Sequence, residues 1–68
     1  MATDRTESIT IDGRQVLVRL RQHDHWVIES IDIPGFPLFT SRHFGDESYS
    51  DLTVVKAAVE KFVRDQLG

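Results

Sequence analysis

Three histidines are the residues in this chain whose type could bind a metal ion. His23 and His25 lie two residues apart in a short polar segment, and His43 lies further along the chain. A zinc or nickel site needs several imidazoles to converge on one point, and no defined motif surrounds these three. The chain has no cysteine, which excludes thiolate ligands, disulfides and a thiol nucleophile. We therefore expect neither a metal nor another cofactor.

The pattern of serines, threonines and glycines does not indicate catalysis. Each hydroxyl residue fits a turn, a helix cap or a strand, and a chain of 68 residues offers little room for a concave pocket. A phosphate-binding loop needs closely spaced glycines, whereas those of this chain stand far apart, at Gly13, Gly35, Gly45 and Gly68. We expect that the protein is not an enzyme.

Among the residue types in this sequence, arginine gives the clearest indication of a binding surface. Arg19 and Arg21 alternate along a predicted strand, and Leu17 projects from the same side. An uncovered sheet face that mixes guanidinium groups with aliphatic side chains is typical of a ligand surface or a dimer interface, although a solvated sheet face is the simpler alternative. The predicted binding residues for nucleic acid or a protein partner are Arg14, Leu17, Arg19, Arg21 and Arg42.

A β-hairpin must position these arginines. Two alternating segments, residues 9–11 and 15–21, flank Asp12-Gly13, which favours a two-residue type I′ turn. This turn pairs Ile11 with Arg14 and Ile9 with Val16. The apolar side chains then share one face, which we expect to be the core face: Ile9, Ile11, Val16, Val18 and Leu20.

A third strand is predicted over residues 26–33, after a polar turn at residues 23–25. The preferred register sets Leu20 opposite Ile28 and Arg19 opposite Glu29, where the charges could pair. Val27 and Ile31 would then join Leu17 on the uncovered face. Asp32 would fall on the core side, from which a bulge or the end of the strand releases it.

The rest of the chain completes an α+β domain. Pro34 and Pro37 limit residues 38–43 to a short edge strand, and apolar spacing from Leu52 to Phe62 predicts a helix over residues 51–67. We expect residues 1–7 to be a flexible tail and residues 8–68 to form one domain. The predicted fold is an antiparallel β-meander of three strands, or four with the edge segment, packed on one C-terminal helix. Its remaining core residues are Trp26, Ile28, Leu52, Val55, Val59 and Phe62, closed at one end by Phe36, Phe39 and Phe44.

Composition and charge restrict the environment and the partners. Neither a signal peptide nor an apolar run long enough for a membrane span is found, so we expect a soluble, cytoplasmic protein without membrane contact. The net charge is −3, and the cations are dispersed along the chain. Non-specific binding to nucleic acid needs clustered cations, so this balance counts against it.

From Trp26 onward the chain resembles the integrase arm-type DNA-binding domain and the related ethylene-response-factor domain. The resemblance rests on Trp26, the segment Phe39-Thr40-Ser41-Arg42-His43-Phe44-Gly45, and Val55-Lys56-Ala57-Ala58-Val59. It implies a three-stranded sheet on one helix that reads the major groove through strand arginines, a role that Arg19 and Arg21 could match. Glu29 and Asp32 depart from this pattern, because carboxylates repel phosphate. Asp32-Ile33-Pro34-Gly35 is similar to a strand end in small antitoxin domains, which implies a protein partner instead.

Two hypotheses follow for the open face of the sheet. One is a small binding module for nucleic acid, motivated by the arginines and the family resemblance. The other is a protein-binding module, most simply a homodimer, motivated by the small size of a chain that has no disulfide to stabilise it. The sequence leaves the choice between them open.

Overall fold

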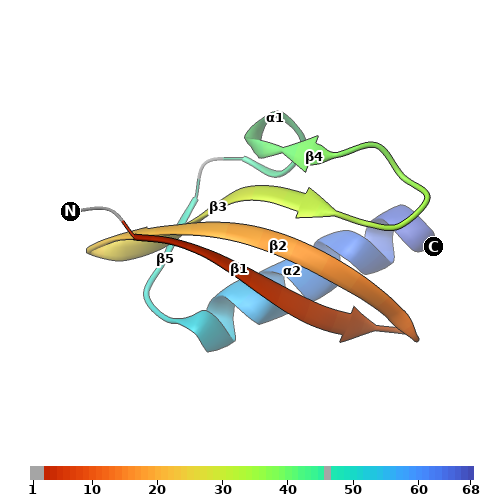
Figure 1. Ribbon diagram of the computed structural model, residues 1–68, viewed down its shortest axis with the longest axis horizontal. Coiled ribbons are helices and arrows are strands. Elements are labelled where there is room, and N and C mark those ends of the chain that lie inside the picture. Colours follow the sequence, from red (N-terminus) through yellow and green to blue (C-terminus); the bar gives the residue numbers. More distant parts are fainter. Residues whose placement is uncertain (1–2, 46) are drawn as a thin grey trace.

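The computed structural model describes residues 3–45 and 47–68, and in it a twisted antiparallel sheet packs on one long helix (Figure 1). The order of strands across the sheet is β1-β2-β3-β4, and β5 also pairs with β3. This arrangement confirms the predicted α+β fold of a β-meander on a C-terminal helix. The elements are β1 (Thr3–Ile11), β2 (Arg14–His23), β3 (His25–Asp32), β4 (Phe39–Thr40), α1 (Ser41–Phe44), β5 (Ser48–Tyr49) and α2 (Leu52–Leu67).

The first hairpin forms in the predicted register. Ile11 pairs with Arg14 and Ile9 with Val16, and the turn residues have positive φ angles, 50° at Asp12 and 80° at Gly13, as a type I′ turn requires. The prediction of a flexible tail over residues 1–7 was wrong for residues 3–7, because β1 begins at Thr3 and pairs with β2 along its whole length. Residues 1–2 lie outside the described part of the chain.

A β-bulge changes the pairing of the C-terminal half of β3 with β2. Leu20 pairs with Ile28 as predicted, but Arg19 pairs with Ser30, so Glu29 is the additional residue on β3. The bulge reverses the faces on which the side chains of the following β3 residues lie. Ile31, predicted on the open face, is fully buried opposite Val18, while Asp32 is exposed on the open face.

The far edge of β3 is shared by two short strands rather than one. β4 pairs with the C-terminal half of β3, through Ser30↔Thr40 and Ile31↔Phe39, and β5 pairs with its beginning. The predicted edge strand over 38–43 is correct only for Phe39–Thr40, because the chain turns into α1 at Ser41. Pairing two short strands at one edge leaves β1 as the long outer strand on the other side of the sheet (Figure 1).

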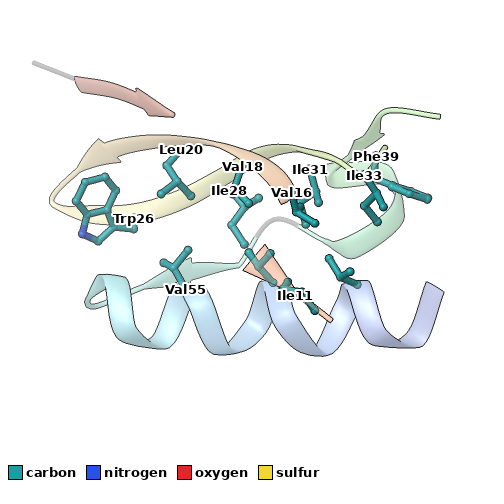
Figure 2. Close-up of a cluster of buried hydrophobic side chains, with 12 residues drawn as sticks. Ile11, Val16, Val18, Leu20, Trp26, Ile28, Ile31, Ile33, Phe39 and Val55 are labelled. Carbon is teal, nitrogen blue, oxygen red and sulfur yellow. The ribbon is translucent and has the colours of Figure 1, made fainter. Parts of the chain in front are cut away.

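Helix α2 covers one face of the sheet and closes the core (Figure 2). Asp51 caps its N-terminus by accepting a hydrogen bond from the Val54 amide at 3.0 Å, and Glu60 and Arg64 form an i,i+4 ion pair at 2.8 Å. The buried core contains Ile11, Val16, Val18, Leu20, Trp26, Ile28, Ile31, Ile33, Phe39, Val55, Val59 and Val63. Predicted core residues that are only partly buried against it are Ile9, Leu52 and Phe62, together with the end-closing Phe36 and Phe44.

In the described residues, no helix combines the length and the apolar character that crossing a membrane would need.

Candidate interaction face of the sheet

The open face is the side of the sheet that α2 does not cover. Strand alternation and the observed register place on it Asp4, Thr6, Ser8, Thr10, Gln15, Leu17, Arg19, Arg21, Val27, Glu29, Ser30, Asp32, Thr40 and Ser48. Half of these side chains carry hydroxyl or amide groups, and Gln15 donates to Ser8 Oγ at 2.6 Å. The face is therefore a polar surface with two separate apolar positions, Leu17 and Val27.

Arg21 lies between two carboxylates on this face. Its Nε atom is 3.1 Å from Glu29 Oε1 and 3.4 Å from Asp4 Oδ1. Glu29 reaches Arg21 rather than its predicted partner Arg19, because the bulge moves Ser30 into the position opposite Arg19. The Arg21 guanidinium is thus already compensated by protein carboxylates.

Glu29 is the most enclosed charged group on the open face. Its Oε1 atom is buried and accepts no well-aligned hydrogen bond from any described residue, so the Arg21 contact is an ion pair without a directed hydrogen bond. A buried polar atom that lacks a hydrogen bond costs about 1–3 kcal/mol. This oxygen is therefore a point at which an additional donor would stabilise the protein.

Leu17 is the large apolar side chain that this face exposes. It is 44% exposed, and Asp32 lies directly across from it on β3. Arg19, two residues further along β2, faces Ser30 and Thr6, and among residues 3–45 and 47–68 it makes no ion pair. Three carboxylates and two guanidinium groups therefore share the face, which leaves it with a net negative charge.

The structure brings three of the five predicted binding residues together. Leu17, Arg19 and Arg21 lie along β2 on the open face, whereas strand alternation places Arg14 on the opposite side at the hairpin end. Arg42 is exposed on α1, beyond the β4 edge of the sheet. The five residues therefore do not form one patch.

Sequence reasoning identified the acidic half of this surface only in part. Asp4 was assigned to the tail, whereas Asp32 was expected to leave the core side of β3 through a bulge or the end of the strand, and the bulge at Glu29 does release it. Glu29 was recognised as an outer residue but was given the wrong partner. The available signal for Asp4 was its charge complementarity with Arg21, which a hairpin extended to Thr3 sets directly opposite.

The remaining candidates for chemistry have structural roles or remain apart. His23 and His25 face each other beside the β2–β3 turn, while the His43 ring packs edge-on against Phe39 with ring centroids 5.2 Å apart. Within the described residues no three potential metal ligands converge. Trp26 points into the core under α2 (Figure 2), and the Arg5 guanidinium lies 6.0 Å from its ring centroid.

A hollow lies on the helix side of the molecule, between α2 and the β3–β5 edge. Its volume is about 300 Å³, and it is lined by Ile28, Ile31, Phe44, Glu47, Tyr49, Ala58, Lys61, Phe62 and Asp65. Partial burial, together with the negative charge of Glu47, raises the pKa of the Tyr49 phenol. Tyr49 therefore remains a neutral hydroxyl group at physiological pH, next to apolar walls.

Comparisons with protein-family models, with curated proteins and with solved structures found no match to this chain.

Proposed function

We propose that this protein is a non-enzymatic binding module whose open sheet face contacts a protein partner. The observation that carries the proposal is the adjacent pair Leu17 and Asp32, an exposed apolar side chain beside a carboxylate on the face that α2 does not cover. An arginine or lysine of a partner fits this pair, because its aliphatic stem can lie on Leu17 while its charged end reaches Asp32. Such a basic residue also complements the net negative charge of the face.

The composition of the open face favours a non-obligate interface. Hydroxyl and amide side chains surround the two apolar positions, whereas obligate interfaces resemble a domain core and are strongly apolar. A partner would gain from directed polar contacts with these hydroxyl and amide groups. We therefore infer a partner that binds and dissociates.

Nucleic acid is the second candidate ligand, supported by Arg19, for which the described residues supply no carboxylate, and by the family resemblance. The carboxylates of Asp4, Glu29 and Asp32 oppose it, because they surround the arginines that would meet phosphate. Titration with duplex DNA at low salt separates the candidates. Absence of binding below about 100 μM would exclude nucleic acid, because non-specific binding alone reaches that strength.

Site-specific photo-cross-linking in cells tests the protein-partner proposal. A photoreactive side chain at Leu17 samples the open face, and one at Val54 is a matched control, since both residues are 44% exposed and Val54 lies on α2. We expect a discrete cross-linked protein from position 17 that is absent from position 54. Products that are the same at both positions, or no product from position 17, would contradict the proposal.

A further inference from the structure

The outer edge of β1 is a second surface of the molecule, separate from the open face. β1 is nine residues long, pairs only with β2 in the described sheet, and contains neither proline nor a bulge (Figure 1). A long regular edge strand of this kind presents unpaired backbone donors and acceptors, which favour the addition of another strand.

The hairpin turn determines which backbone groups face this edge. A two-residue turn makes Ile11 and Arg14 exchange both of their backbone hydrogen bonds, and such pairs alternate along an antiparallel ladder. The odd-numbered residues of β1 therefore bond to β2. The amide and carbonyl groups of the even-numbered residues point outward, at Asp4, Thr6, Ser8 and Thr10.

The charges on β1 are self-complementary. Arg5 and Glu7 lie two residues apart on the same side of the strand, and their side chains already contact each other at 2.5 Å. If a second β1 pairs antiparallel about a two-fold axis at Thr6, Arg5 of each chain lies opposite Glu7 of the other. A guanidinium has five donors, so Arg5 can hold both carboxylates without breaking the existing contact.

We propose that two copies of this chain associate through β1, centred on Thr6, to form one continuous sheet. Thr6 then exchanges both backbone hydrogen bonds with its symmetry copy, and Asp4 bonds with Ser8 on each side, giving about six hydrogen bonds. Arg5 and Glu7 fall in the non-hydrogen-bonded pairs, where opposing side chains lie closest. Both α2 helices cover one side of this dimer, and both open faces lie on the other.

The neighbouring registers are less favourable. Each residue must stay on its own face of the sheet, so the pairing can shift only by two residues, which moves the two-fold axis by one residue. Centring the axis on Glu7 sets two glutamates against each other, and centring it on Arg5 does the same with two arginines. Centring it on Ser8 sets Glu7 against Ile9 and Arg5 against Ile11. Among these registers only the one at Thr6 pairs opposite charges.

Charge reversal tests both the edge and its register. The variants Arg5→Glu and Glu7→Arg each place like charges across the axis twice, so we expect each to weaken self-association at least about tenfold. Mixed in equal amounts, they should form a heterodimer as strong as the wild-type dimer, because every pair across the axis then joins opposite charges. Sedimentation velocity over about a hundredfold range of concentration measures this, with Trp26 fluorescence as the check on folding.

Proline substitution provides a second test that does not depend on charge. Thr6→Pro removes an outward amide at the two-fold axis and leaves the β1–β2 hydrogen bonds in place, so it should abolish the dimer. Thr10→Pro removes an outward amide beyond the Thr3–Ile9 overlap and should not. Leu17→Lys, on the open face, should also leave the dimer intact. The proposal would be overturned if the wild-type chain remained monomeric over the whole concentration range. It would also be overturned if neither Thr6→Pro nor charge reversal weakened the dimer.

Discussion

Replacing Ile31 with valine tests the β-bulge that defines the open face. Ile31 is 0% exposed, so the substitution removes one buried methylene group, worth about 0.8 kcal/mol in transfer free energy. Adding the residual cavity gives an expected loss of about 0.5–1.5 kcal/mol. A domain of this size has a surplus of only about 3–5 kcal/mol, so the change is a measurable fraction of its stability.

Urea unfolding followed by Trp26 fluorescence provides the measurement, with the free energy obtained by linear extrapolation. Val27→Thr is the control, because Val27 lies on the open face before the bulge and should change stability by less than about 0.5 kcal/mol. Without the bulge, Ile31 would share the exposed face with Val27. An Ile31→Val protein within about 0.3 kcal/mol of wild type would therefore refute the observed register.

Three further predictions concern the turn, the helix cap and the tyrosine. Gly13→Ala forces a side chain onto a residue with φ of 80° and should cost about 1 kcal/mol or more in urea unfolding. Asp51→Ala removes the acceptor for the Val54 amide and should lower the free energy of unfolding by about 0.5–2 kcal/mol. Folding favours the protonated Tyr49 phenol, so its stabilising effect is present below the ordinary pKa of 10.0 and is lost as pH rises through the folded value. Phenolate absorbance of this single tyrosine should titrate above pH 10.0 in the folded protein. The free energy of unfolding of Tyr49→Phe should fall less steeply than that of the wild type as pH rises into the alkaline range.

The first hairpin could be predicted because its local signals agree. Asp12-Gly13 fixes the turn type, and alternation on both sides fixes which residues face the core, so no distant contact was needed. The helix was predictable from its apolar spacing, which is also a local signal, although that spacing did not identify Asp51 as the cap. Because these local sequence signals agree, the first hairpin and the helix could be predicted from the sequence.

The errors arose where tertiary contacts decide the structure. Residues 3–7 are polar, so they read as a tail, yet Asp4 pairs with Arg21 and Arg5 lies over Trp26 when β1 is extended. A bulge was one of the two ways in which Asp32 was expected to leave the core side, but the sequence did not indicate that it would fall at Glu29. The bulge is favoured because it buries Ile31 and exposes Asp32, which continuous alternation could not do.

The composition of the open face depended on that bulge and was therefore only partly predictable. Leu17, Arg19 and Arg21 were placed correctly relative to one another by alternation along one strand. Their neighbours on β3 required a register that the sequence did not specify, and Asp4 required the hairpin to extend to Thr3. As a result the arginines were identified, whereas the pairing of Asp4 and Glu29 with Arg21 was not.

The most direct test of the proposed protein-binding face compares two lysine substitutions for their effect on affinity. Leu17→Lys removes the apolar position and neutralises Asp32 opposite it, so the sheet itself should tolerate the change. Val54→Lys alters an equally exposed residue on α2. Affinity for the cross-linked partner, measured by calorimetry, should fall at least about tenfold for Leu17→Lys and less than about twofold for Val54→Lys. Equal losses, or a loss confined to Val54→Lys, would contradict the assignment of binding to the open face.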